Sequence, residues 1–218
     1  MTNIKRNDYG VESFGHLVLE MPEWRPPPSL LRFLDSGEPL VYVGFGSVPV
    51  RDPAGEIARW AEAARRAGTR ALLYPAAGFT DWDRDYGEHV HLVRFAPHDW
   101  LLPRTAAAVH HGGAGTTHGA LAAGVPQGVI PFSLDQPYFA RRVAALGLGP
   151  GGLDPGRTDV EGPTRILTDL TRGERAEGYR RRAREAARAV ERENGARTAA
   201  RILFLSTVLL SGFWYGWW

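Results

Sequence analysis

Residues 109–119, VHHGGAGTTHG, hold three histidines, four glycines and two threonines directly after an apolar run. Glycines lack a Cβ and let a ligand approach the backbone, and the free N–H groups at the start of a following helix attract phosphate. The threonine hydroxyls can donate to phosphate oxygens or cap the helix. The stretch therefore indicates a diphosphate site, although its spacing is neither G-x-G-x-x-G nor a Walker Gly-Lys-Ser/Thr.

Two other interpretations of this stretch remain open at this point. Metal binding is the weaker one, because His110 and His111 would point to opposite faces of a strand and could not easily share one ion. No H-E-x-x-H spacing occurs either, and no nearby carboxylate pair completes a shell. The plain structural alternative is a tight turn with one buried, hydrogen-bonded histidine.

The stretch is embedded in an alternation of short apolar runs and helical patterns. The runs typical of buried strands are 40–45, 70–74, 89–93, 106–111 and 127–132, and the helical segments are 53–67, 99–104, 117–123 and 136–146. This alternation predicts an α/β fold with a single doubly wound parallel sheet covered on both faces. Ligands bind such sheets outside the carboxyl ends of the strands, which brings residues 44–47 close to the 112–117 turn.

Composition excludes several classes of protein. The 218 residues include no cysteine, so disulfides and thiolate metal sites are ruled out. No secretory signal peptide is visible at the start, which makes a cytoplasmic location the expectation. The formal net charge is only +2, and Lys5 is the single lysine among 26 basic residues. Ten arginines against five glutamates over 172–201 are typical of a solvated helix face, so no nucleic-acid partner is expected.

The chain divides into three parts by composition. Residues 1–39 form a linker-like segment, because Pro22, Pro26, Pro27, Pro28 and Pro39 are expected to break any regular element. Residues 40–201 contain the α/β pattern. Residues 202–218, ILFLSTVLLSGFWYGWW, carry no charge and six aromatic side chains. This apolar tail predicts association with a membrane or with protein, including self-association.

Several motifs in the same order resemble the C-terminal, donor-binding domain of GT-B glycosyltransferases. They are GFGS (44–47), RFAPHDWLLPR (94–104), VHHGGAGTTHGALAAGVPQGVIPF (109–132) and DQPYFARRVAALGLGP (135–150). The similarity runs from about Gly15 to Arg201 and is greatest to sterol 3-β-glucosyltransferase-like and antibiotic-aglycone enzymes, relatives of the UDP-glycosyltransferases. It implies a Rossmann-like domain that is the C-terminal half of a GT-B fold.

The resemblance also implies the residues of a donor site. The glycine-rich turn would hold the pyrophosphate of a nucleotide-sugar, with His110 reaching the phosphates and His111 left as structural. His118, where plant relatives carry glutamate, could donate to the ribose or simply be exposed. The other implied donor-binding residues are Gly113, Ala114, Gly115, Thr116 and Thr117 at the turn, Ser47 at the neighbouring turn, Phe95 to His98 at the base, and Asp135 and Gln136 at the sugar hydroxyls. No metal and no cofactor is needed.

The function implied is the donor-binding half of an inverting glycosyltransferase. It would move a hexose from a nucleotide-sugar, with UDP-glucose expected, to a hydroxyl of a lipophilic acceptor such as a sterol or a natural-product aglycone. The general base belongs to the family's N-terminal acceptor domain, so a separate protein carrying that domain is an expected partner. The alternative is a non-catalytic nucleotide-sugar-binding or helper protein. The location expected is cytoplasmic, peripheral to the membrane if the tail acts as an anchor.

Overall fold

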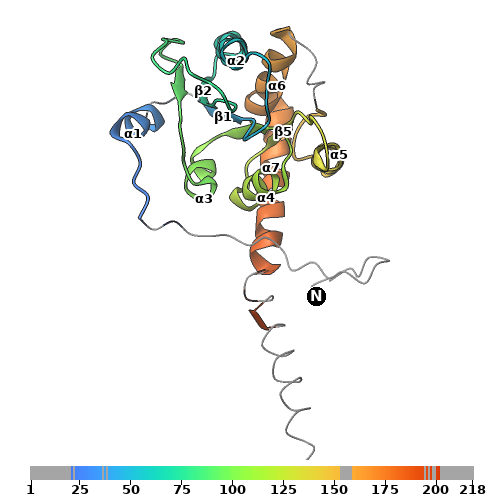
Figure 1. Ribbon diagram of the computed structural model, residues 1–218. Coiled ribbons are helices and arrows are strands. Elements are labelled where there is room, and N and C mark those ends of the chain that lie inside the picture. The colour runs from blue at the N-terminus through green and yellow to red at the C-terminus, as the bar shows by residue number, and fades with distance from the viewer. Residues whose placement is uncertain are drawn as a thin grey trace, which may run out of the picture.

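The structure is a computed structural model that describes residues 21, 23–35, 37, 39–152, 159–193, 195, 197, 200 and 201. Its centre is a five-stranded parallel sheet with the order β3-β2-β1-β4-β5 (Figure 1). The strands are β1 (Leu40–Gly44), β2 (Arg70–Tyr74), β3 (Val90–Leu92), β4 (Ala107–His110) and β5 (Gln127–Val129). The predicted parallel α/β sheet is confirmed, and each strand lies within one of the predicted runs.

Helices cover both faces of this sheet (Figure 1). On one face lie α2 (Pro53–Ala67) and α6 (Glu161–Thr171), and on the other lie α1 (Pro28–Leu34), α3 (His98–Leu101) and α4 (Ala114–Ala123). A single 3₁₀ turn, η1 (Leu102–Arg104), continues α3. Beyond β5 stands α5 (Gln136–Ala145), and the long α7 (Gly173–Glu193) packs against α4 and α6.

The side chains of β1 show how two cores share one strand. Val41 and Val43 enter the core under α2 and α6, where Trp60 is completely buried. Leu40 and Tyr42 point the other way, into the core under α1, α3 and α4. All five residues of β1 are buried, because helices on both faces remove both sets of side chains from water. That double burial explains the unbroken apolar run in the sequence.

The first helix after β1 is bounded by the residues that its sequence suggests. The Asp52 carboxylate accepts a hydrogen bond from Gly55 N at 2.8 Å, and Pro53 occupies the first turn of α2. Gly68 ends the helix in the left-handed conformation, with φ of 59°. An N-cap, an N-terminal proline and a C-terminal glycine together fix the ends of α2.

The expectation that prolines break every regular element in 1–39 is wrong for residues 28–34. Pro28 starts α1, since a proline in the first turn loses no intrahelical hydrogen bond and already has a helical φ. Leu30 on this helix is 0% exposed and packs with Tyr42 and Leu72. The Arg70 guanidinium also donates to the Phe33 carbonyl oxygen. This part of the linker-like segment is therefore packed onto the domain.

The second correction concerns α4, which begins at Ala114 and not at residue 117 as predicted. The glycine-rich turn therefore supplies the first turn of the helix itself. Residues 1–20 and the apolar tail 202–218 lie outside the described residues, so the expectations for the tail stay predictions. Among the helices that are described, none is long and apolar enough to cross a membrane.

Candidate functional site

The central strands β1 and β4 mark the point where the sheet changes direction. The chain leaves β1 toward α2 on one face and leaves β4 toward α4 on the other. Gly44, the last residue of β1, is in register with His110, the last residue of β4. The GFGS turn and the 111–113 turn therefore lie side by side at the carboxyl edge. This topological switch point is where open α/β sheets bind ligands.

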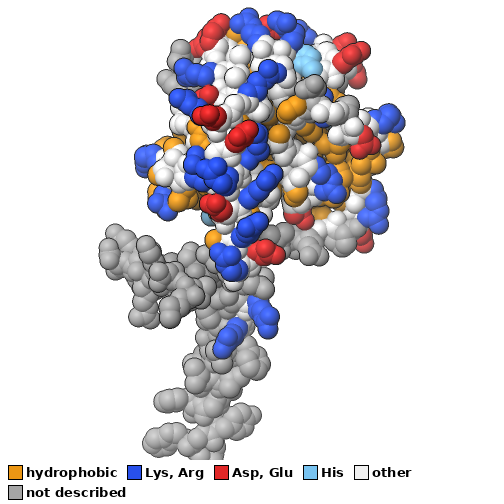
Figure 2. Space-filling model, turned by 180° about the vertical axis from the view of Figure 1, so that it is seen from behind, with side chains coloured by type: hydrophobic (Ala, Val, Ile, Leu, Met, Phe, Trp, Pro, Cys, Tyr) orange, Lys and Arg blue, Asp and Glu red, His pale blue; other side chains and the backbone are white. Residues whose placement is uncertain are grey.

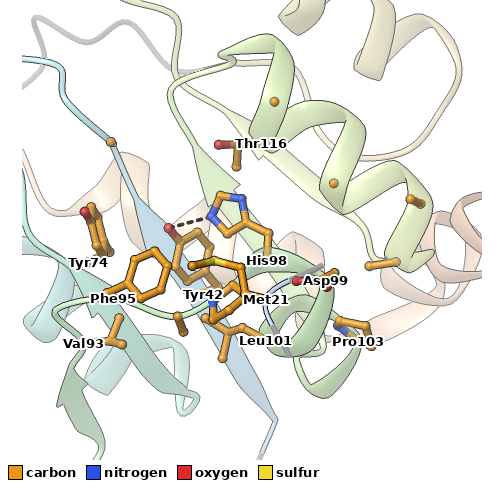
Figure 3. Close-up of a pocket in the computed structure, with 17 residues that line it drawn as sticks. Met21, Tyr42, Tyr74, Val93, Phe95, His98, Asp99, Leu101, Pro103 and Thr116 are labelled. Carbon is orange, nitrogen blue, oxygen red and sulfur yellow. Dashed lines mark hydrogen bonds between the residues drawn. The ribbon is translucent and has the colours of Figure 1, made fainter. Parts of the chain in front are cut away.

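A cavity of about 530 Å³ opens at this edge, on the side of α3 and α4 (Figure 3). Its size lies within the range of small-molecule sites. Phe95 stands at its mouth with 49% of its surface exposed, and Tyr74 lies on the same side. The lining comes from eight parts of the chain: Met21, Tyr42 of β1, Gly46, Tyr74 of β2, the 93–97 segment, α3, Pro103 of η1 and α4.

Tyr42 and His98 form the polar centre of this mostly apolar cavity. Their Oη and Nε2 atoms are 3.4 Å apart, as the dashed line in Figure 3 marks. Burial raises the pKa of the Tyr42 hydroxyl well above its usual value, and the neighbouring Tyr74 adds to this effect. Burial also lowers the pKa of His98, against the opposing influence of Asp99. Both groups are thus neutral, and a hydrogen bond joins Tyr42 Oη to His98 Nε2.

That hydrogen bond orients the ring of His98. In the tautomer in which Nε2 accepts from Tyr42, the proton of the neutral imidazole is on Nδ1, which becomes a donor. A Cβ placed on Gly119 of α4 would lie 3.9 Å from this Nδ1 atom. The cavity therefore contains one oriented ring nitrogen of His98 between α3 and α4. His98 and Phe95, both expected at the base subsite, are brought together here.

The N-terminus of α4 borders the cavity and is uncapped by any side chain. Thr117 N makes the first intrahelical bond, to Gly113 O at 3.0 Å, which leaves the N–H groups of Ala114, Gly115 and Thr116 without a helical partner. A Cβ on Gly115 would meet nothing within 4 Å, so the approach to these groups is open. The uncapped first turn and the helix dipole together favour an anion.

The two threonines of this turn differ, although both were predicted to offer hydroxyls to a ligand. Thr116 lines the cavity. Thr117 is buried, and its hydroxyl donates to Gly113 O at 2.9 Å. Its hydroxyl is therefore engaged within α4, and the structure contradicts a direct contact from Thr117 to a ligand. The hydroxyl of a threonine in a helix commonly donates a hydrogen bond to the carbonyl oxygen four residues earlier.

The structure also contradicts the assignment of His110 to the donor phosphates. Its side chain is 0% exposed. Nε2 lies 2.9 Å from the Gln127 side-chain oxygen, and Nδ1 accepts from Gly112 N at 3.1 Å. Burial lowers the pKa of His110 to about 4, so the ring is neutral with its proton on Nε2. Both nitrogens are engaged inside the fold, and the imidazole holds β4, β5 and the turn together.

His111, expected to be structural, is the histidine that lies between the two glycine-rich turns. A Cβ on Gly46 would lie 3.0 Å from its Cε1 atom, and a Cβ on Gly113 would lie 2.4 Å from its Nε2 atom. Its buried Nδ1 atom has no hydrogen-bond partner in the described part of the chain. Burial lowers the pKa of His111, while the Gly44 backbone and the Asp135 carboxylate act in the opposite direction.

The remaining predicted residues lie around the start of α5 and the first turn. Asp135 is exposed and makes no capping hydrogen bond, and Ser47 is exposed beyond the GFG turn. Gln136 is buried, and its side-chain oxygen accepts from Phe132 N at 2.8 Å and Ser133 N at 3.1 Å. Both hydrogen bonds hold this oxygen to the loop before α5. The structure therefore contradicts the expected sugar contact through this atom.

The same loop contains a strained residue. Leu134 has a φ of 57°, a conformation that is unfavourable for a non-glycine residue, and its side chain is 91% exposed.

His118 stands apart from the cavity and lies edge-on to Phe139, with ring centroids 5.5 Å apart. Within the described residues there is no group of three or more histidine, aspartate and glutamate side chains arranged to hold a metal.

Three residues of the candidate site were not anticipated as such from the sequence: Tyr42, Tyr74 and His111. Tyr42 and Tyr74 were counted only as apolar members of buried strands. Their positions at or near the carboxyl ends of neighbouring strands were the available signal, because that edge forms the site. For His111, strand alternation indicates that the two histidines point apart, but not which one faces the site.

The fold and the order of the motifs agree with comparisons to known proteins. A family model described as "Erythromycin biosynthesis protein CIII-like, C-terminal domain" matches residues 82–199, more than half of the chain. The chain is 38% identical over 149 residues to a sterol 3-beta-glucosyltransferase of Arabidopsis thaliana, covering 67% of this chain and 23% of that protein. It is 44% identical over 131 residues to the vancomycin aglycone glucosyltransferase of Amycolatopsis orientalis, covering 59% of this chain and 31% of that protein.

Solved structures include a variant of Os79 from O. sativa in complex with UDP, which superimposes with a TM-score of 0.66 and 26% identity. That match covers 82% of this chain and 45% of the solved one, so the chain spans less than half the length of the relatives described here. The order of motifs, the sheet topology and the family match agree. The chain therefore belongs to the family of erythromycin biosynthesis protein CIII-like C-terminal domains, a group within the GT-B glycosyltransferases.

Proposed function

We propose that this domain binds a nucleotide-sugar, UDP-glucose, and provides the donor half of an inverting hexosyl transfer to a hydroxyl group of a lipophilic acceptor. The observation that carries the proposal is a continuous surface at the carboxyl edge of the sheet. It joins an aromatic cavity containing His98 to the uncapped N-terminus of α4 and to His111. A nucleoside diphosphate has chemical groups in the same order along its length: a flat base, a ribose and two anionic groups.

The base would occupy the cavity. Phe95 offers a ring face at the mouth, and a half-exposed aromatic side chain gains favourable contact area when a planar base stacks on it. With Tyr42 as the donor to Nε2, His98 would offer an Nδ1–H to a carbonyl oxygen of the base or to the ribose. The bonded Tyr42 hydroxyl keeps that donor oriented. Uracil, with two carbonyl oxygens, suits a site with such a donor.

The diphosphate would lie over the first turn of α4. Three N–H groups, the Thr116 hydroxyl and the His111 imidazole converge there, and all of them favour negative charge. During transfer the departing nucleotide gains negative charge, so the same groups would stabilise the leaving group in the transition state. His111 is neutral in the free protein because of burial, and an adjacent phosphate would raise its pKa and favour the imidazolium.

The hexose would project toward the exposed Asp135 at the start of α5. A carboxylate there can accept hydrogen bonds from sugar hydroxyls, while the Gln136 side-chain oxygen keeps the preceding loop in place. The acceptor and the general base that deprotonates its hydroxyl would come from the acceptor domain of a GT-B enzyme. An inverting displacement of this kind needs no metal ion from this domain.

Isothermal calorimetry with uridine, UMP and UDP tests the proposal. We expect affinity to rise with each phosphate, and His111→Ala to weaken UDP by roughly 10-fold to 150-fold, as the loss of a hydrogen bond to a charged group of about 1.5–3 kcal/mol implies. Uridine binding should be unaffected by that change. His118→Ala, which removes a nearby imidazole outside the cavity, serves as the matched control.

Two results would contradict the proposal. If UDP binds no more tightly than uridine, the first turn of α4 is not a phosphate site. If the chain binds no uridine compound at all, the donor assignment fails. Asp135→Ala separately tests the sugar contact, because it should weaken UDP-glucose while leaving UDP unchanged. A non-catalytic nucleotide-sugar-binding protein would give the same calorimetry, so activity measurements are needed to distinguish it.

A further inference from the structure

Two of the large hydrophobic side chains that the structure leaves exposed lie at the His98 cavity. Charged side chains are spread widely over the surface, as the face in Figure 2 shows. Met21 and Phe95, by contrast, are apolar, are 48% and 49% exposed, and line the same cavity. Figure 3 shows the Met21 side chain reaching over Tyr42, between Phe95 and His98. Exposed apolar groups that line a cavity gain favourable contact area when a ligand enters it.

Met21 belongs to a short segment that precedes α1 and is called here the strap: Met21 and residues 23–27. At one end the strap leads into α1, whose Leu30 is completely buried. Pro26 and Pro27 stiffen that end, because each proline fixes its own φ. Trp24 N donates to the Met21 carbonyl oxygen at 3.1 Å, so the backbone turns between these two residues. The strap is therefore attached to the domain at α1 and folded back at Met21.

A pair of tryptophans attaches the strap to α3. The rings of Trp24 and Trp100 meet edge to face, with centroids 4.8 Å apart and an angle of 63° between their planes. The Arg104 guanidinium lies 4.2 Å from the centroid of the Trp100 ring and donates to the Trp100 carbonyl oxygen, which holds this ring in place. Trp100 and His98 belong to the same short helix. The contact that holds the strap is therefore built on the element that supplies the polar centre of the cavity.

We propose that Met21 is a specificity-determining contact for the base of the nucleotide, and that Trp24 is the residue that positions it. This inference rests on the proposed function, because it takes the His98 cavity as the base subsite. The base would lie between the Met21 thioether and the Phe95 ring, which both line the cavity. A thioether is polarisable and makes favourable contacts with aromatic rings. The strap thus forms one wall of the base subsite.

A wall at this position limits the size of the base. The cavity of about 530 Å³ has to hold the ribose as well as the base. A purine has two fused rings and a pyrimidine has one, so a space-filling side chain opposite Phe95 favours the smaller base. Replacing Met21 by alanine removes most of that side chain and widens the cavity, while His98 and its partner Tyr42 stay unchanged.

Calorimetry of the full chain with uridine, UDP and ADP tests the role of Met21. The unaltered chain should prefer UDP to ADP. Met21→Ala should weaken uridine and UDP by the same factor, roughly twofold to tenfold, because the lost contact is to the base. The preference for UDP over ADP should fall by a similar factor, since the wider cavity admits a purine. Leu146→Ala is the matched control: Leu146 is also 48% exposed but does not line the cavity, and its loss should change none of these affinities.

Variants of Trp24 test the positioning role. Trp24→Ala should weaken uridine as Met21→Ala does. The double variant should bind no more weakly than Met21→Ala alone, because Trp24 acts through Met21. Trp24→Phe keeps an aromatic edge against Trp100 and should restore the affinity of the unaltered chain. In every variant the ratio of UDP affinity to uridine affinity should stay constant, which shows that the phosphate end of the site is retained.

Three outcomes would overturn the proposal. The first is that UDP and ADP bind equally to the unaltered chain, or that Met21→Ala keeps either its affinity for uridine or its preference for UDP. The second is tighter uridine binding by Met21→Ala, which would make Met21 a residue that blocks the cavity. The third is an additive loss in the double variant, or unchanged binding by Trp24→Ala. All three leave UDP binding and its dependence on His111 intact, whereas failure of the proposed function means that the unaltered chain binds no uridine compound.

Discussion

His110 and His111 are consecutive residues whose surroundings give them opposite roles. His110 is enclosed between Gln127 and the Gly112 N–H, whereas His111 has an unpartnered nitrogen between two glycine turns. His110 should therefore govern stability and His111 ligand affinity. Replacing His110 by alanine leaves a cavity and two unpaired polar groups, so we expect a loss of about 2–5 kcal/mol in the free energy of unfolding.

The buried His110 also predicts how stability depends on pH. Its pKa is about 4 in the folded protein, below the ordinary value near 6.5, so the unfolded chain binds the proton more tightly. The free energy of unfolding is therefore highest above pH 6.5. It falls by on the order of 3 kcal/mol as the pH drops from 6.5 to 4. Urea unfolding across this range should show a shallower decline for His110→Gln than for the wild type or for His118→Gln. Equal declines in all three proteins would refute the assignment.

At the same scale, the residue types of the site were predictable from the sequence. The directions in which their side chains point were not. A strand buried on both faces gives no apolar–polar alternation, so nothing in 106–111 tells which histidine faces the sheet edge. Phe95, His98 and Thr116 line the cavity, and their contact with a donor stays a prediction. The Thr117 hydroxyl and the Gln136 side-chain oxygen are instead occupied by backbone groups within hydrogen-bonding reach. Whether a side chain bonds to the nearby backbone or stays available to a ligand depends on the folded geometry, which residue spacing alone does not reveal.

Among the elements, α1 is the one that could not be recognised from the sequence as part of the domain. Its prolines were interpreted as helix breakers, but position decides their effect: Pro28 lies in the first turn, where it favours the helix. Leu30 is completely buried against the sheet, whereas its neighbour Leu31 is 40% exposed. Other elements were predictable because periodicity, caps and terminal glycines agreed with one another, as in α2.

This arrangement gives a direct test of whether α1 is part of the folded domain. Leu30→Ala should lower the free energy of unfolding by about 2–5 kcal/mol, as expected for truncating a fully buried leucine. The matched change Leu31→Ala should cost no more than about 0.5 kcal/mol. Chemical denaturation measures both. If the two variants prove equally stable, residues 28–34 are a linker and not a component of the core.

At the scale of the whole molecule, the donor half and the chemistry of transfer can be separated. Inverting transfer needs a general base within about 2.6–3.2 Å of the acceptor hydroxyl, directly or through one water. In the described part of the site, His98 bonds to Tyr42 and His110 to Gln127, and neither bonds to a carboxylate that could activate it. Burial also lowers the pKa of His98, His110 and His111, which makes each a poorer base.

We therefore expect the purified chain to bind UDP-glucose but to transfer no glucose to sterol or aglycone acceptors. Adding an acceptor domain from a close GT-B relative should restore turnover, because that domain would supply both the base and a pocket that orients the acceptor. A radiolabelled glucose transfer assay measures both conditions, with His111→Ala as the variant that should abolish the restored activity through the donor site. Transfer by the chain alone would disprove the missing-base argument. Persistent inactivity with a docked acceptor domain would instead favour a non-catalytic nucleotide-sugar-binding protein.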